Sequence, residues 1–328
     1  MENKMITLED LTNVANENYL KFLKEGQVKS ILRNIGLFAD HTIDNDILIL
    51  TQNPNATCVK RLTEWNFYKR NIKKNEKAIK IISHHIYSNN LGGKEKDGKI
   101  YVDGIEKLKV EVGYVFDISQ TEGKPFEYLN TNKETLAKFF DNTKKALEYT
   151  AKDYTFAYDD TTDNFSIDEE NKVIHIKNGM TLDETTNALI KSVSQIALKS
   201  RHFNGVKSDD IAEIDDIELY GTIYAVNSRL GLELPEYDFD NIQNWTDDNL
   251  ALFKTNLQKI RSVSKQIIAN VESSIEYAIR SLNREKTKQK ETIENSSESK
   301  EEKIEEKEEL KETKPKRTKK KQAESEVE

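Results

Sequence analysis

The 328-residue chain has one cysteine, Cys58, so it can form neither a disulfide within itself nor a metal site made of cysteines. No apolar run approaches the ~20 residues needed to cross a bilayer, and the first residues include acids in place of the apolar core of a signal peptide. The sequence also has no phosphate-binding loop, no glycine-rich dinucleotide fingerprint and no paired-carboxylate signature. We therefore expect a cytoplasmic protein that does not insert into a membrane and needs no cofactor.

Prolines and glycines are scarce, four and twelve in all, so charge marks the domains better than turn residues do. Residues 1–130 hold 19 Lys or Arg and 18 Asp or Glu, whereas residues 131–282 hold 17 and 26. Residues 283–328 hold 14 of each and almost no large apolar side chain, so they cannot bury enough surface to offset the entropy of ordering. These counts predict a nearly neutral first domain, an acidic second domain and a disordered tail. The basic block KRTKKK at residues 316–321 is either a solvated part of that tail or an accessory contact for nucleic acid.

The pattern of apolar residues predicts an α+β fold for the first domain. Helical spacing favours helices over residues 7–26 and 28–38, and we interpret the apolar run at residues 47–50 as part of a buried helix. Residues 58–68 are expected to form a further helix. Alternation of apolar and polar residues predicts strands at residues 78–82, 99–102 and 107–118. The glycine-containing turns between these strands favour a small, mostly antiparallel sheet.

The second domain is predicted to be mainly helical. A β-hairpin is expected within residues 154–176, turning at residues 168–171, and Thr181 with Glu184 forms the pattern of a helix capping box. Apolar residues at three- and four-residue spacing predict helices over residues 135–151, 181–199, 211–230 and 247–282.

One segment combines basic and aromatic residues more densely than the rest of the chain. Between residues 60 and 80 there are two acids, Glu64 and Glu76, and eight cations, which are Lys60, Arg61, Lys69, Arg70, Lys73, Lys74, Lys77 and Lys80. Three aromatic residues lie among them: Trp65, Phe67 and Tyr68. Basic grooves that follow phosphates and aromatic rings that stack on bases are how proteins hold single-stranded nucleic acids. The other interpretation is that Trp65 and Phe67 belong to the core and the lysines to a solvated face.

A turn comes just before this segment. Pro54 fixes its own backbone and restricts Asn53 to extended conformations, while asparagine side chains satisfy nearby amides. We expect the residues of this turn to position the basic segment; they are Gln52, Asn53, Pro54 and Thr57.

In these motifs the chain resembles the ArdC-type antirestriction and LtrC-like proteins carried by plasmids, conjugative elements and phages. The matching residues are Gln52, Pro54, Ala56, Thr57 and Trp65 for a Q-x-P-x-A-T motif with its tryptophan, Lys73, Lys74, Glu76 and Lys77 for a K-K-G-E-K motif, and residues 112–121, VGYVFDISQT, for V-F-D-x-S-Q-T. The resemblance covers about residues 10–130 and implies a domain that binds single-stranded DNA. Where the family has glycine in the basic loop this chain has Asn75, which tolerates a left-handed backbone better than most residues.

The second domain resembles the zinc-metallopeptidase-like half of the same family, but without its metal-binding motif. Where the family has H-E-x-x-H, this chain has Lys191 and Gln195 at the two histidine positions and Ser192 at the glutamate position. Two histidines four apart would give zinc neutral nitrogens from one helix face, and the glutamate would activate bound water. Lysine brings a cation instead, so we expect no bound metal and no peptidase activity. Glu218 roughly matches a downstream acidic ligand position.

We therefore expect a non-enzymatic protein that binds single-stranded DNA in a bacterial or phage-infected cell, with antirestriction as its role. The acidic second domain is a candidate surface for a protein partner. Two alternatives remain open at this point: an active hydrolase built on the second domain, and a replication or conjugation accessory protein that acts through protein partners. The contacts expected of the basic segment would also suit duplex DNA or RNA, and the sequence does not specify an oligomeric state.

Overall fold

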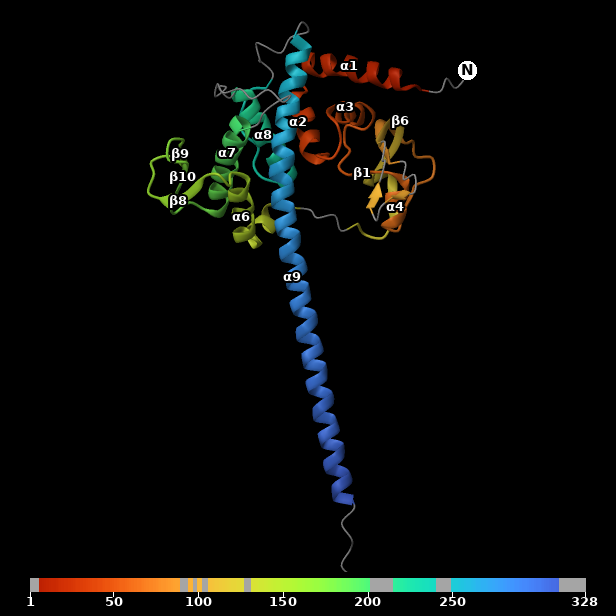
Figure 1. The fold of residues 1–328 in the computed structure, drawn as a ribbon, viewed down its shortest axis with the longest axis vertical. Helices are drawn as coiled ribbons and strands as arrows, with labels where there is room; N and C mark the ends of the chain where they lie inside the picture. The colour runs from red at the N-terminus through yellow and green to blue at the C-terminus, as the bar shows by residue number, and fades with distance from the viewer. Residues whose placement is uncertain are drawn as a thin grey trace, which may run out of the picture. The chain divides into compact units, whose positions relative to one another are not determined.

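The computed structural model describes residues 6–88, 94–96, 99–101, 106–126, 131–200, 215–239 and 249–312. The chain divides into two compact units, Met1–Glu276 and Tyr277–Glu328. All contacts described below lie within the first of these units. For the described residues the prediction of a mixed α+β fold is confirmed, because they form helices together with several small sheets (Figure 1).

Three helices open the chain: α1 (Leu8–Lys24), α2 (Val28–Leu37) and α3 (Ile43–Gln52). The hydroxyl of Thr7 caps α1 by accepting a hydrogen bond from the backbone amide of Asp10, and Thr42 caps α3 in the same way. The apolar run at residues 47–50 lies in α3 and is at most 3% exposed, so the prediction of a buried helix is confirmed.

The main sheet of the first half is antiparallel, as predicted. Its strand order is β1 (Val59–Lys60), β6 (Glu106–Asp117) and β3 (Ile79–Ser88). Two smaller antiparallel pairs are formed by β2 (Arg70–Ile72) with β7 (Thr121–Gly123) and by β4 (Lys94–Lys96) with β5 (Lys99–Tyr101). A short 3-10 helix, η1 (Ile118–Gln120), joins β6 to β7.

The helix expected over residues 58–68 is shorter than predicted. Val59 and Lys60 pair with Asp117 and Phe116 of β6, so the helix α4 spans only Leu62–Phe67. The sequence pattern could not show this because the partner strand lies more than fifty residues away in the chain.

Helix α3 runs along the outer side of β3 and is tied to it by two side-chain amides. The amide of Asn45 donates to the carbonyl of Ile82 and accepts from its N–H, at 2.8 Å in both bonds. Two helical turns later, the amide of Gln52 makes the same pair of bonds with Lys80, at 2.8 and 2.9 Å. Two turns of a helix therefore replace a neighbouring strand at residues 80 and 82.

The second half holds α5 (Lys133–Lys138), α6 (Phe140–Thr150), β8 (Thr155–Asp159), β9 (Phe165–Asp168), β10 (Val173–Lys177), α7 (Leu182–Ser200), α8 (Asp216–Leu230) and α9 (Leu250–Glu312). The predicted hairpin is β9 with β10, and the predicted capping box is present, since Thr181 and Glu184 each accept the backbone amide of the other. β8 pairs in parallel with β10, which makes this sheet mixed. The single helix expected over residues 135–151 is interrupted at Phe139.

One hydrophobic core joins the two halves of the chain. It contains residues of α1, α2 and α3 together with residues of α8 and α9, among them Ile35, Ile217 and Ile260. Helices α2 and α8 pack so closely that a Cβ atom added to Gly36 would lie 2.1 Å from the carbonyl oxygen of Ala225 (Figure 1). The boundary expected near residue 130 therefore does not coincide with a break in the core.

Helix α9 continues to Glu312, whereas the composition predicted disorder from residue 283. The difference has a local cause, because lysine and glutamate are good helix formers and form favourable pairs at four-residue spacing. The basic block at residues 316–321 lies outside the described residues. In the part of the chain that the structure describes, no helix is long and apolar enough to span a membrane.

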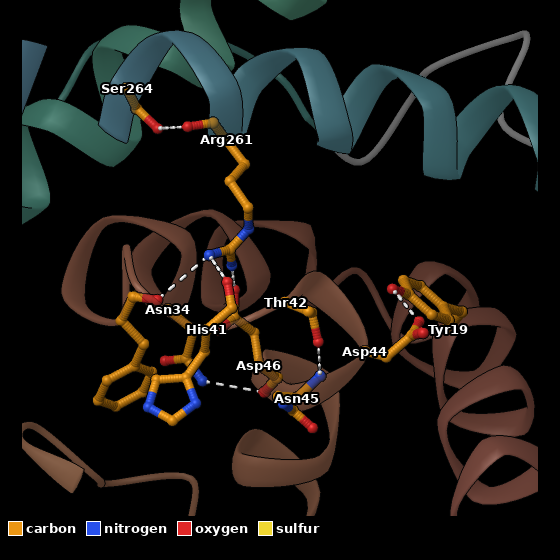
Figure 2. A network of polar contacts seen from close by, with 10 residues as sticks. Tyr19, Asn34, His41, Thr42, Asp44, Asn45, Asp46, Arg261 and Ser264 are labelled. Atoms are coloured by element: carbon orange, nitrogen blue, oxygen red, sulfur yellow. Dashed lines mark hydrogen bonds and ion pairs between the residues drawn. The ribbon is translucent and has the colours of Figure 1, made fainter. Parts of the chain in front are cut away.

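A buried ion pair fastens α9 to α3 (Figure 2). The guanidinium of Arg261 contacts the carboxylate of Asp46, whose side chain is fully buried, and also donates to the backbone carbonyls of Phe38 and His41. Burial lowers the pKa of Arg261 to about 10, which still leaves the group protonated at neutral pH. Burial and the nearby Arg261 charge lower the pKa of His41 to about 4, so its imidazole is uncharged at neutral pH.

Candidate nucleic-acid interface

The basic segment predicted from the sequence runs through β1, α4 and β2 and then along the loop that leads into β3. Its side chains differ in how far they reach into solvent: those of Arg61, Lys69, Lys73, Lys74 and Lys77 are exposed, and those of Lys60, Arg70 and Lys80 are half-buried. The structure therefore keeps most of the predicted cations on the surface, but it does not leave all of them free.

Three of these cations are held by hydrogen bonds to the protein itself. Arg70 donates through Nε and Nη2 to the hydroxyl and carbonyl of Thr121, at 2.7 and 3.0 Å. The ammonium of Lys73 donates to the carbonyl of Ser119 at 2.7 Å, and Arg61 donates to the hydroxyl of Ser83 at 2.9 Å. These side chains connect β2 to β7, the basic loop to η1, and the start of α4 to β3. The cations with no such bond among the described residues include Lys74, Lys77 and Lys80.

Trp65 is a core residue and not part of an exposed stacking surface. Its side chain is fully buried, and its indole N–H donates to the carbonyl of Phe116 at 2.9 Å. Its ring also meets the edge of Phe126, with 5.2 Å between ring centroids. The expectation that Trp65 would stack on a base is corrected by this burial, because a nucleobase cannot reach the ring.

Phe67 and Tyr68, by contrast, remain accessible. The side chain of Phe67 is 76% exposed and that of Tyr68 is 40% exposed, and the two rings meet edge to face at 5.3 Å. The ammonium of Lys60 lies 5.6 Å from the centre of the Tyr68 ring, within the range of a cation–π interaction. Two of the three predicted aromatic residues thus lie on the surface beside a cation.

Asp117 organises the loops around the basic segment. Its carboxylate is 1% exposed and accepts three backbone N–H groups, from Thr57 at 2.8 Å, Cys58 at 2.9 Å and Ser119 at 2.9 Å. Two chain segments sixty residues apart are held together in this way. Asp117 belongs to the sequence VFDISQT, so this motif acts here as a scaffold for the neighbouring loops.

Gln120, from the same motif, holds the basic loop. Its amide donates to Glu76 at 2.9 Å and to the carbonyl of Lys77 at 2.8 Å, and it accepts the backbone N–H of Asp117. Asn75, at the tip of this loop, has a φ of 69°, the left-handed conformation that the sequence led us to expect. The turn before the segment is also anchored, since Gln52 bonds to β3 and the backbone amide of Thr57 bonds to Asp117, with Asn53 and Pro54 between them.

A groove of about 890 Å³ lies between the end of α3, this loop and the β3–β6 pair. It is lined by Gln52, Asn53, residues 75–80, Tyr114, Ser119 and Gln120. Tyr114 is 53% exposed and is the cross-strand partner of Lys80, so an open aromatic ring and a lysine lie next to each other on one face. The sequence pattern did not point to Tyr114 as part of the site. Its position beside Lys80 depends on the register between β3 and β6, which the sequence alone does not give.

The structure places side chains that are poor metal ligands at positions 191, 192 and 195 of α7. Lys191 is exposed on α7, while the buried hydroxyl of Ser192 donates to the carbonyl of Leu189 at 3.0 Å. Gln195 is half-buried one turn further on. Glu218, the candidate acidic ligand, is 6% exposed and accepts a hydrogen bond from Lys259 at 2.7 Å. Over the described ranges, no three His, Cys, Asp or Glu residues gather as metal ligands would.

No family model matches this chain, and no curated protein matches it either. Among solved structures it is similar to the metal-free antirestriction ArdC protein from plasmid R388, with 14% identity over 70% of this chain and 85% of that chain and a TM-score of 0.40. It is also similar to the Mn(II)-bound structure of that protein, with 13% identity over 81% and 95% of the two chains and a TM-score of 0.40. Likeness of this degree does not establish a shared function.

Proposed function

We propose that this protein binds single-stranded DNA at the surface formed by the basic loop and the β3–β6 pair, and that it does so without catalysing a reaction. The observation that carries the proposal is the groove beside Tyr114, where an exposed aromatic ring lies across from Lys80 and where Lys77 also lines the wall. Stacking a base on an aromatic ring contributes about 1–3 kcal/mol, and it requires an unpaired base. Single strands therefore fit this surface better than a duplex does.

The electrostatics of the surface support the same partner. Between residues 60 and 80 eight cations face two acids, in a chain with a net charge of −8. Lys74 and Lys77 are exposed, and their ammonium groups donate no hydrogen bond to the described residues, so these groups are available to phosphates. Phe67 and Tyr68 offer a second exposed aromatic surface on the neighbouring α4 segment. Together these residues supply the alternation of charge and aromatic rings that follows an extended strand.

We further propose that the bound DNA is protected from restriction in a bacterial or phage-infected cell. The support for this role is the motif resemblance of residues 52–121. The acidic second half, with an excess of nine negative charges over residues 131–282, is the candidate surface for a protein partner. A replication or conjugation accessory role would use the same DNA-binding surface.

The lysines make the binding sensitive to salt. We expect the variant Lys74→Ala/Lys77→Ala to bind a labelled single strand more weakly, because two phosphate contacts are lost. The slope of log affinity against log salt is negative, and its magnitude should become smaller by about 1.4, since each contact on a single strand contributes about 0.7. Fluorescence anisotropy over a salt series measures both quantities.

The matched control is Lys152→Ala/Lys191→Ala, which removes the same charge from two exposed lysines in the second half. It should bind like the unmodified chain. Equal salt slopes for the two double variants would contradict this placement of the site, and absence of binding by the unmodified chain would contradict the function itself.

The second half is proposed to be catalytically silent. Purified protein dialysed against zinc and then freed of loosely bound metal should contain far less than one zinc per chain by elemental mass spectrometry. The reason is that Lys191 brings a cation to the metal position and Glu218 is already paired with Lys259. A content near one zinc per chain would favour the alternative of an active hydrolase.

A further inference from the structure

The groove beside Tyr114 contains polar groups that the fold does not use. Gln52 and Gln120 also line it, but their amides are committed to backbone groups of β3, α3 and the basic loop. The side-chain amides of Asn53 and Asn75 make no hydrogen bond within the described residues. Since neither amide holds the structure together, both are available to a ligand in the groove.

Among the described residues that line this groove, Glu76 is the one acid. Its Oε2 accepts a hydrogen bond from the amide of Gln120 at 2.9 Å, and Gln120 is itself held by Asp117 and by the carbonyl of Lys77. Glu76 Oε1 has no hydrogen-bond partner in the part of the chain that the structure describes. The carboxylate is therefore held by one oxygen, and the other oxygen can only accept a hydrogen bond. A carboxylate beside Lys77 and Lys80 does not help to attract phosphate, but Oε1 can accept a hydrogen bond from a donor group of a ligand in the groove.

We propose that the groove is a nucleobase pocket that prefers a base with an exocyclic amino group, such as cytosine, over thymine. This inference rests on the proposed binding of single-stranded DNA and deepens it. In this pocket the base stacks on Tyr114, its edge faces Glu76, and Lys77 and Lys80 contact the adjoining phosphates.

The selectivity follows from the hydrogen-bonding groups of the two pyrimidines. Cytosine has an amino group at C4, which donates to a carboxylate, whereas thymine has a carbonyl oxygen at the same place. Thymine's one ring donor on this edge, N3–H, lies between two carbonyl oxygens that repel a carboxylate, so thymine is the poorer partner. The amides of Asn53 and Asn75 each contain a donor and an acceptor, so they can pair with either base and add affinity without choosing. Glu76 is thus the residue that determines the choice.

The test compares labelled oligo-dC with oligo-dT of equal length, at neutral pH and moderate salt, by fluorescence anisotropy. The two strands have the same phosphates and similar rings, so their difference reports the base edge. We expect the unmodified chain to bind oligo-dC roughly tenfold more tightly, the size of one good base-edge contact. In Glu76→Gln the amide can still accept from Gln120 through its oxygen and can also donate to thymine. The preference should fall to nearly one.

A control for charge is Glu122→Gln, which removes one negative charge from exposed β7 outside the groove. It should strengthen binding to both strands slightly and keep the preference. Equal binding of both strands by the unmodified chain, or an unchanged preference in Glu76→Gln, would overturn the pocket while leaving the proposed function intact. Failure to bind either strand would instead refute the proposed function.

Discussion

Replacing Asp46 with alanine should lower the free energy of unfolding by about 3–5 kcal/mol, because it leaves the guanidinium of Arg261 buried without its counter-ion. The loss would affect more than one contact, since Arg261 lies on α9 and also holds the carbonyls of Phe38 and His41 (Figure 2). Urea unfolding followed by circular dichroism measures the change. A domain's total stability is only about 5–15 kcal/mol, so this single substitution should remove a large part of it.

The matched control removes both charges. In Asp46→Ala/Arg261→Met no buried charge is left without a partner, and replacing a buried ion pair by apolar residues is often nearly neutral. We expect the double variant to be more stable than Asp46→Ala alone. If Asp46→Ala does not accumulate as folded protein, Asp46→Asn keeps the volume and gives the same comparison. Equal stability of the single variant and the unmodified chain would show that the pair is not buried in solution.

Replacing Trp65 with alanine should cost about 3–5 kcal/mol of unfolding free energy, the range for deleting a large aromatic side chain from a core. The ring is fully buried, and its loss would also leave the carbonyl of Phe116 without its hydrogen bond. Urea unfolding again supplies the measurement.

Phe67→Ala is the matched comparison, because Phe67 lies two residues away and is 76% exposed. It should change the unfolding free energy by no more than about 0.5 kcal/mol, as exposed substitutions usually do. It should nevertheless weaken the binding of single-stranded DNA. A Trp65→Ala variant with unchanged stability and lost DNA binding would instead assign Trp65 to the stacking surface.

This contrast shows where local sequence reasoning reaches its limit. Trp65, Phe67 and Tyr68 are equivalent in a sequence, since all three are aromatic and lie among lysines. Which of them is buried depends on Phe116, a residue 51 positions away that offers its carbonyl to the indole. Propensity and spacing therefore predicted the composition of the surface but could not sort core from exposed rings.

The local elements were predicted more fully than their assembly. Helix α3, the β9–β10 hairpin and the capping box of α7 each depend on residues close together in the chain, and all three are confirmed. The shared core depends on Gly36 meeting Ala225 across nearly 190 residues, and charge counts by segment do not contain that information. Tyr114 escaped notice for the same reason, because its place beside Lys80 is fixed by strand register.

The amides of Asn45 and Gln52 also affect whether a second copy of the chain can add a strand to β3. A strand at the border of a sheet presents backbone groups that can recruit a strand from another molecule. At residues 80 and 82 those groups are already occupied by side chains from α3, in the geometry that an incoming strand would use. This stretch of β3 is therefore closed to the addition of a strand from a second copy of the chain.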